Sequence, residues 1–233
     1  MKRLKLRVIP HTLNNSIRSK RVKYSKELLQ QLHELKPIDV ITCDESWFYF
    51  NNHGNSMWVK EKNELPIIEK RGIDSKKVMI SIFWNFYNLV HIQCVPEGDV
   101  VDTDYIVFTL FPELYDIALK HRPSQGLKSF ALHWDNAKPH RSRDTSAAVE
   151  ELFRCSLAHP PYSPDLAPSD FFLFGHLKRL LQGKIITNVS HLKMELEHAF
   201  KTINTEMKKG VFNEWIRRLE ETVESGGEYI NTI

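Results

Sequence analysis

Hydrophobic side chains recur along the chain at two spacings, and each spacing predicts one kind of secondary structure. Residues 24–35 place leucines on one helical face, and Pro37 ends this helix because a residue before proline disfavours helical geometry. The turn at residues 87–88 joins two strands into an antiparallel hairpin. Strands rich in β-branched and aromatic side chains are predicted at residues 38–50, 78–86, 89–95 and 128–135.

The remaining hydrophobic segments predict helices. Pro112 interrupts the first of them, Asp144 or Thr145 caps the second, and Gly183 stops the third. Residues 155–169 open as a short strand and continue as a proline-rich loop. The predicted helices are residues 103–121, 144–153 and 170–182, with two amphipathic helices after them whose apolar positions span 192–203 and 212–223.

This order of elements predicts the fold class. Three successive strands, followed by alternating helices and strands, indicate an α/β fold with a mixed sheet flanked by helices and further helices appended at the C-terminal end. The ribonuclease-H-like architecture of the retroviral-integrase type has this order. With 233 residues, of which 42% are hydrophobic and 26% charged, the chain can build one globular domain with a substantial core.

Composition excludes several other classes of protein. No apolar run approaches the roughly 20 residues that cross a bilayer, so no membrane partner is expected, and the basic first residues lack the apolar core of a secretory signal. The 3 cysteines are far apart and fit neither zinc spacing nor a disulfide framework, which favours a reducing compartment. The 11 histidines show no paired zinc-binding spacing.

Positive charge gathers at the N-terminal end. Residues 1–26 contain nine lysines and arginines and no acidic side chain. By charge alone, this arm is explained as a solvated terminus, and as a contact for a polyanion only with further support. The candidate DNA-binding residues are Arg18, Lys20, Arg21 and Lys23 in the arm, with Lys138, Arg141 and Arg143 farther along.

Three aspartates stand at positions that need an explanation. Asp44 lies inside the first strand, where aspartate is rare, and Asp135 ends the fourth strand. Asp170 opens a helix, at the start of the stripe formed by its inward-facing apolar residues. Each has a structural alternative, because Asp135 can close a turn and Asp170 gains about 0.3–1 kcal/mol from the helix dipole.

Together the three carboxylates favour metal chemistry. In the expected pairing of the first and fourth strands, Asp44 and Asp135 lie side by side at the centre of the sheet. Three converging carboxylates repel one another unless cations neutralise them, and hard oxygen ligands suit Mg²⁺ or Mn²⁺. Two such ions about 3.5–4 Å apart form the usual clamp for in-line phosphoryl transfer.

Other polar residues near these aspartates receive smaller roles. Asn136 and His140 are given supporting positions beside Asp135. Glu45 follows Asp44 but faces the other side of the strand. Asp165 is explained by turn formation within its proline-rich surroundings.

Several segments resemble the catalytic domain of mariner-type transposases. DESW at 44–47 and HWDNAKPH at 133–140 carry two of its aspartates, and HPPYSPDLAPSDFFLFGHLK at 159–178 carries the third. In that family 34 residues separate the second and third aspartates, which is the interval between Asp135 and Asp170 here. RVIPHTL at 7–13 resembles the family's interdomain linker, and FNEWIRRLEETVESGGEYI at 212–230 resembles its C-terminal end.

The resemblance implies a ribonuclease-H-like fold and a transposase activity. It implies two Mg²⁺ or Mn²⁺ ions at Asp44, Asp135 and Asp170, cleavage of DNA at transposon ends by water, and joining of the 3′-hydroxyl to a target at a TA dinucleotide. It also implies a homodimer, with residues 51–77 in the segment that contacts the partner, and a nuclear location if the host is eukaryotic.

The domain organisation departs from the family in one respect. Family members carry two helix-turn-helix modules before the linker, and this chain begins at the linker, so recognition of transposon ends is not expected of it. We divide the chain into a basic linker arm and helix, residues 1–36, and a catalytic domain, residues 37–233.

Two alternatives to a DNA strand transferase stay open at this point. One is a truncated, non-catalytic remnant that binds DNA or dimerises. The other is a ribonuclease-H-type hydrolase of RNA–DNA hybrids, which shares the carboxylates and lacks the proline-rich motif. Nicking of plasmid DNA in Mg²⁺ or Mn²⁺ separates the enzyme from the remnant.

Overall fold

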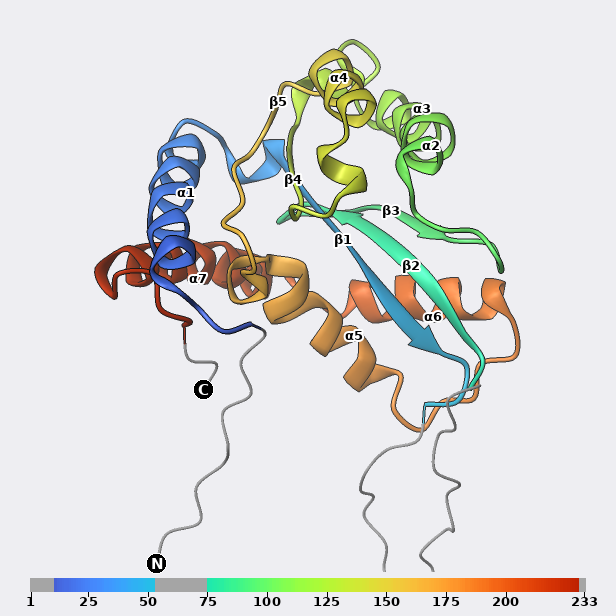
Figure 1. The fold of residues 1–233 in the computed structure, drawn as a ribbon. Coiled ribbons are helices and arrows are strands. Elements are labelled where there is room, and N and C mark those ends of the chain that lie inside the picture. The colour runs from blue at the N-terminus through green and yellow to red at the C-terminus, as the bar shows by residue number, and fades with distance from the viewer. Residues whose placement is uncertain (1–10, 53–74, 231–233) are drawn as a thin grey trace, which may run out of the picture.

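A five-stranded mixed sheet forms the centre of the molecule (Figure 1). The computed structural model describes residues 11–52 and 75–230. The strand order is β3-β2-β1-β4-β5, with β1 antiparallel to β2 and parallel to β4, and this confirms the predicted ribonuclease-H-like arrangement. The strands are β1 Val40–Tyr49, β2 Lys77–Trp84, β3 Leu89–Cys94, β4 Ala131–His133 and β5 Cys155–Ser156.

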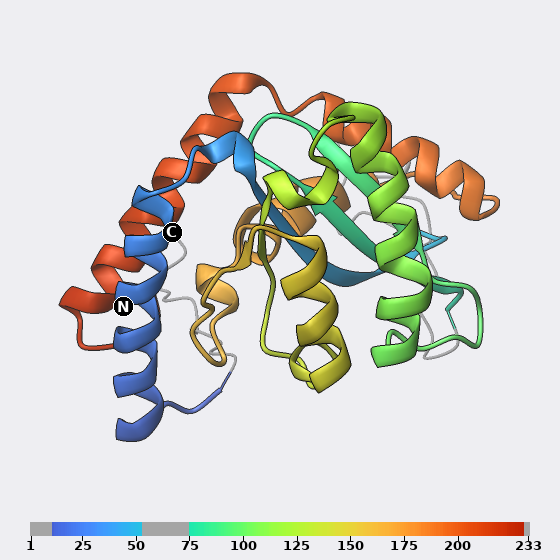
Figure 2. The same cartoon turned by 90° about the horizontal axis from the view of Figure 1, so that it is seen from above.

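Helices lie on both faces of this sheet (Figures 1 and 2). The group on one face comprises α2 Thr103–Tyr105, α3 Phe111–His121 and α4 Arg143–Leu152. The group on the other comprises α5 Phe174–Leu180, α6 Val189–Lys201 and α7 Thr205–Glu224, with α1 Asn15–His33 packed against α7. Two π-helical turns precede helices: Ile106–Leu110 before α3 and Ser169–Leu173 before α5.

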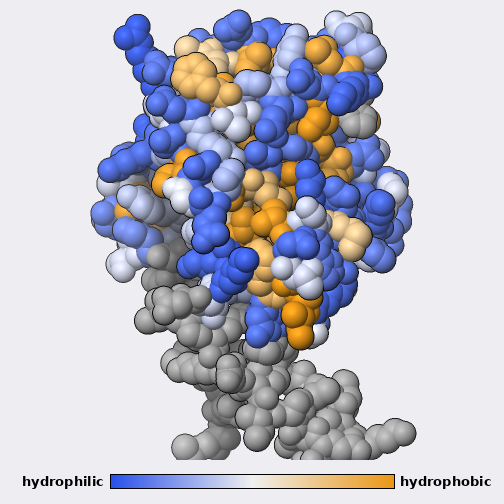
Figure 3. Space-filling view, turned by 90° about the vertical axis from the view of Figure 1, so that its right-hand side faces the viewer, coloured by the Kyte–Doolittle hydropathy of each residue, from blue (hydrophilic) through white to orange (hydrophobic). Residues whose placement is uncertain are grey.

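Alternating side chains of β1 supply two separate hydrophobic cores. Val40 and Phe48 pack in the core beneath α5, α6 and α7, whereas Ile41 and Cys43 pack beneath α3 and α4. Asp44 shares the parity of Val40 and therefore points to the α5 side. On the face at the right of Figure 1, apolar side chains reach the surface in patches between hydrophilic ones (Figure 3).

Within the described part of the chain, no helix combines the length and the apolar character needed to cross a membrane.

The first helix is longer than its hydrophobic pattern predicted. It begins at Asn15 rather than at residue 24, and the side chain of Asn14 caps it by accepting a hydrogen bond from the Ile17 N–H at 2.9 Å. The buried face of the added turns carries Arg21, which with Ser25 continues the stripe of Leu28 and Leu32. Apolar spacing did not predict these turns because their buried face carries a polar residue.

Three other predicted details change. The cap of α4 is Ser142, whose Oγ accepts from the Thr145 N–H at 3.1 Å, instead of Asp144 or Thr145. Pro112 does not break its helix: residues 103–121 are helical without interruption, and the π-helical turn Ile106–Leu110 lies directly before α3, which contains the proline. Strand β4 is shorter than predicted because its first residues form the 3₁₀ turn Gly126–Ser129.

Candidate active site

Strand pairing brings two of the predicted aspartates to the same end of the sheet. The parallel register of β1 and β4 runs from Val40 opposite Ala131 to Thr42 opposite His133. Asp44 and Asp135 each follow two residues later, so their side chains leave neighbouring strands at the same level. As predicted from the strand order, they lie near the centre of the sheet, because β1 is its middle strand.

The third aspartate reaches the same place from the π-helical turn before α5. Asp170 lies in the turn Ser169–Leu173, and its carboxyl group is hydrogen-bonded to that of Asp44. Burial, together with the negative charges of Asp170 and Glu45, raises the pKa of Asp44 to about 9. Partial removal from water and the charge of Asp135 also raise the pKa of Asp170. With a pKa of about 9, Asp44 keeps its proton at neutral pH in the absence of a cation.

Asp135 has a different environment, which keeps it ionised. Its Oδ1 accepts hydrogen bonds from the Ala137 N–H at 2.9 Å and from His140 Nδ1 at 2.7 Å. Burial opposes ionisation of Asp135, but these hydrogen bonds and the charge of His140 outweigh it and lower its pKa. The His140 ring is itself fixed by stacking on Trp134, at 4.3 Å between centroids and 6° between planes.

His140 also links Asp135 to a carboxylate that strand alternation had set aside. Its Nε2 lies 3.7 Å from Glu45 Oε2. Burial lowers the pKa of His140, but the hydrogen bond with Asp135 and the charge of Glu45 exceed this and raise it. Glu45 does face the other side of β1, as predicted, and contacts the site through the histidine rather than directly.

A buried pair of neutral histidines lies behind Asp135. His133 Nδ1 is 3.1 Å from Thr42 Oγ1, and its Nε2 is 3.1 Å from His159 Nδ1. Burial lowers the pKa of His159 to about 4 and lowers that of His133 well below its usual value. The pair thereby joins the end of β4 to the loop that leads to Asp170.

The two predicted supporting residues have different partners. His140 contacts Asp135 directly, whereas the Asn136 Nδ2 group donates to the carbonyl oxygen of His159 at 2.7 Å. Asn136 therefore fixes the proline-rich loop rather than an aspartate.

Sequence reasoning missed Lys178, which lies beside the acidic pair. Its Nζ donates to Ser46 Oγ at 2.6 Å and lies over the rings of Phe48 and Phe174. Partial burial lowers its pKa, although the nearby Asp170 and Asp44 act in the opposite direction. The available signal was its helical spacing, since a residue eight positions after Asp170 shares the same face.

The donor set suits a divalent cation. Three carboxylates supply the hard oxygen ligands that Mg²⁺ and Mn²⁺ prefer. Within residues 11–52 and 75–230, no three acidic, histidine or cysteine side chains are gathered closely enough to ligate one ion together. A bound cation would offset the burial and the mutual repulsion that raise the pKa values of Asp44 and Asp170.

The predicted DNA-binding residues fall into two groups. Lys138, Arg141 and Arg143 are exposed just after Asp135, and Lys20 and Lys23 are exposed on α1. Arg18 is half-buried and forms an ion pair with Glu228 at 2.7 Å.

The prediction that Arg21 binds DNA is wrong. Its side chain is 0% exposed and pairs with Asp165, so it cannot reach a DNA phosphate in this structure. Its charge in the sequence gave no sign of this burial.

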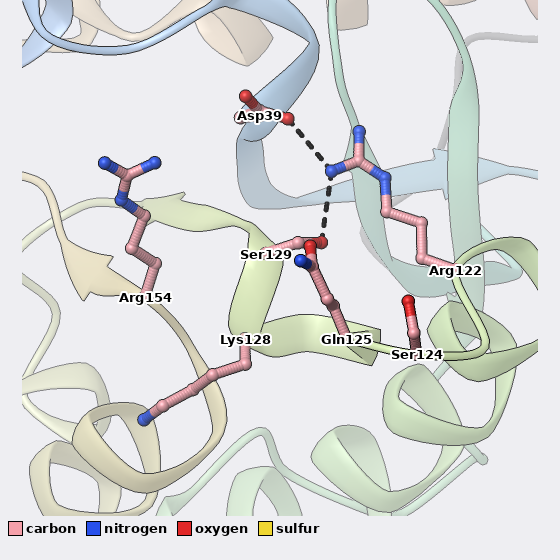
Figure 4. A pocket seen from close by; sticks show the side chains of 7 residues that line it. All are labelled: Asp39, Arg122, Ser124, Gln125, Lys128, Ser129 and Arg154. Atoms are coloured by element: carbon pink, nitrogen blue, oxygen red, sulfur yellow. Dashed lines mark hydrogen bonds and ion pairs between the residues drawn. The ribbon is translucent and has the colours of Figure 1, made fainter.

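A separate polar pocket of about 540 Å³ lies at the opposite end of the sheet (Figure 4). Its lining residues are Asp39, Arg122, Ser124, Gln125, Lys128, Ser129 and Arg154. Two of its cations are already engaged: Arg122 Nη1 donates to Asp39 at 2.9 Å, and Lys128 Nζ donates to the carbonyl oxygens of Glu150 and Glu151 at 2.8 Å. Asp39 directly precedes β1, whereas Asp44 lies in the middle of that strand, so the pocket is separate from the aspartates.

Comparisons with known proteins concern the family and the fold. Residues 48–111 match a family model described as a transposase, partial DDE domain; the matched segment contains none of the three aspartates. The chain is 26% identical over 230 residues to the mariner Mos1 transposase of Drosophila mauritiana, covering 96% of this chain and 66% of that protein. The resemblance to mariner-type transposases is confirmed.

A human relative extends the comparison. The chain is 28% identical over 230 residues to the histone-lysine N-methyltransferase SETMAR of Homo sapiens, covering 96% of this chain and 33% of that protein. The chain thus spans about a third of SETMAR and about two thirds of the Mos1 transposase.

Solved structures of the Mos1 transposase share the fold. A paired-end complex with Mn superposes with a TM-score of 0.85 at 24% identity, covering 99% of this chain and 68% of that one. The isolated Mos1 catalytic domain gives 0.76 at 24% identity and is covered over its full length (100%). The mixed sheet with its flanking helices is therefore the ribonuclease-H-like fold of the mariner catalytic domain.

Proposed function

We propose that this chain cleaves and joins DNA strands in a metal-dependent reaction, by in-line phosphoryl transfer at Asp44, Asp135 and Asp170. The observation that carries the proposal is the convergence of the three aspartates: Asp44 and Asp135 leave neighbouring strands at the same level, and Asp170 lies beside Asp44. Such a cluster lowers the stability of the metal-free fold, because like charges repel. Clusters of this kind occur at functional sites, and cation binding explains this one. The similarity to mariner-type transposases supports DNA as the substrate class.

Each residue has a distinct part in this proposal. The three aspartates would hold two Mg²⁺ or Mn²⁺ ions, which when bound would activate the attacking oxygen and stabilise the leaving oxygen. His140 holds Asp135 ionised and oriented, while stacking on Trp134 limits movement of the imidazole. Solved Mos1 structures that contain Mn or Mg support this choice of ions.

DNA would approach along the exposed cations after Asp135. Lys138, Arg141 and Arg143 project at the start of α4 and would contact phosphates without reading base sequence. One Mos1 structure is a paired-end complex with a left transposon end, which supports transposon-end DNA as substrate. A second copy of this chain is proposed as partner. A TA target dinucleotide is part of the same proposal.

Plasmid nicking tests the function. Purified protein is incubated with supercoiled plasmid in Mg²⁺ or Mn²⁺, alongside the variant Asp135→Asn, which preserves the shape of the side chain and removes the charge. We expect nicks with the wild type and none above background with the variant. If the variant nicks as well as the wild type, the site is assigned wrongly. An absence of nicks in either metal, with salt-sensitive DNA binding retained, would instead favour the non-catalytic remnant.

A further inference from the structure

A buried ion pair fixes the loop between β5 and Asp170. Arg21, on α1, has a completely buried side chain, and its guanidinium group forms two parallel hydrogen bonds with the carboxylate of Asp165. The two N···O distances are 3.0 Å and 2.8 Å. The two residues are 144 positions apart in the chain, so the pair ties the N-terminal helix directly to the loop.

The remaining donors of Arg21 bring in the C-terminal segment. Its Nε donates to the Gly227 carbonyl oxygen at 2.9 Å, one Nη donates to that of Glu228 at 3.1 Å, and the other donates to Ser163 Oγ. All five N–H groups of the guanidinium thus have acceptors. Asp165 accepts one further hydrogen bond, from the Ile230 N–H at 3.0 Å.

From Asp165 the loop is held at successive residues up to the candidate active site. The Trp215 indole N–H donates to the Leu166 carbonyl oxygen at 2.8 Å, and the Trp84 indole N–H donates to Ser169 Oγ at 3.0 Å. The Asp170 N–H then donates to the Ala167 carbonyl oxygen at 3.0 Å. The position of Asp170 therefore depends on contacts that begin at Arg21.

A role in stability alone explains this pair poorly. The cost of removing two charges from water offsets much of the attraction of a buried ion pair, and well-packed apolar residues often stabilise a protein as much. What a bidentate arginine–carboxylate pair supplies is a defined geometry.

We infer that the Arg21–Asp165 pair is a positioning device that holds the loop so that Asp170 meets Asp44. The inference rests on the proposed function to the extent that Asp170 is taken as a metal ligand. Neither Arg21 nor Asp165 touches the reacting atoms, and both act through the loop. Helix α1 and the segment 227–230 thereby become part of the support of the site, although they are far from it in sequence.

Amide hydrogen exchange tests the positioning without any assumption about activity. The variants are Arg21→Met and Asp165→Asn, with Arg21→Lys as a milder change that keeps the charge and loses the two-pronged geometry. Lys26→Gln is the matched control, because it removes a positive charge at an exposed position of the same helix. We expect the amides of Asp170 and Phe171 to exchange at least about 10-fold faster than in the wild type, while the amides of β1 and the whole control variant stay unchanged.

Steady-state nicking provides the second measurement. A misplaced Asp170 should lower kcat at least about 10-fold and leave KM for DNA within about twofold, because positioning acts on the chemical step. Arg21→Lys should recover part of the loss. Three results would each overturn the inference. Exchange could accelerate equally throughout the chain, exchange at Asp170 could stay unchanged, or kcat could stay normal although the loop exchanges faster. If the wild type itself fails to nick, the proposed function fails, and the exchange data still decide whether the pair positions the loop.

Discussion

Replacing Asp44 with asparagine should stabilise the metal-free protein while abolishing its response to metal. Burial and the charges of Asp170 and Glu45 raise the pKa of Asp44 from 3.8 to about 9. At pH 7 the folded chain therefore keeps a proton that the unfolded chain has released. Neutral pH lies about three units above the ordinary aspartate value, so keeping this proton costs at most about 4 kcal/mol of folding free energy. Asparagine retains the shape and a hydrogen-bond donor for Asp170 without that cost.

The direction in which stability changes with pH follows from the raised pKa of Asp44. The contribution of Asp44 to wild-type stability is fully present below about pH 4 and is lost as the pH rises towards 9. The advantage of Asp44→Asn should therefore be near zero at pH 4 and should grow to about 1–4 kcal/mol at pH 7–8.

Urea unfolding in EDTA at pH 4, 6 and 8 measures this difference. Asp116→Asn, at an exposed position of α3, is the control and should change little at any pH. Adding Mg²⁺ or Mn²⁺ should then raise the unfolding free energy of the wild type and not that of Asp44→Asn. A variant less stable than the wild type at pH 8, or a difference that does not vary with pH, would refute the reasoning.

Two further predictions concern the surroundings of the site. The contribution of His159 to wild-type stability should fall by up to about 3 kcal/mol as the pH falls from 6.5 to 4, because burial lowers the pKa of His159 to about 4 and the unfolded chain binds a proton first. In urea unfolding, the wild type should therefore lose stability relative to His159→Gln over this range, and a difference that does not change with pH would count against the prediction. Gly227→Ala should lower the unfolding free energy by more than about 3 kcal/mol, since a Cβ would lie 2.4 Å from the Arg18 carbonyl oxygen. Gly226→Ala should lower it by about 1–2 kcal/mol, because a Cβ there meets nothing within 4 Å and only the backbone conformation is strained. Equal losses in the two glycine variants would show that close packing at Gly227 is unimportant.

The meeting of the three aspartates could be predicted because each is placed by a local pattern. An aspartate inside a β-branched strand, another at the end of the paired parallel strand and a third at the start of an amphipathic helix are visible in the sequence. Their convergence then requires only the order of the strands, which the succession of elements indicates. The division at residue 36 stays a prediction, although α1 packs closely against α7.

The surroundings of the aspartates were harder to predict, because they depend on contacts between distant segments. Arg21 and Lys20 are adjacent cations in the sequence, yet one is fully buried and the other exposed. Arg21 lies on the buried face of α1, where Asp165 from a different element pairs with it, whereas Lys20 lies on the exposed face. Glu45 likewise contacts the site through His140, which lies in another segment of the chain and is placed by the stacking of its ring on Trp134.

The π-helical turn that contains Asp170 sets how the Asp170 carboxylate is oriented relative to α5. A π turn holds one residue more than an α-helical turn, so the carboxylate and the apolar face of α5 are set at a particular angle to one another. Deleting one residue from Ser169–Leu173 would rotate Asp170 by about 100° relative to Leu177. Either the carboxylate or the core contact of Leu177 would then be lost. The number of residues between Asp170 and α5 therefore limits the lengths that this segment can have in evolution.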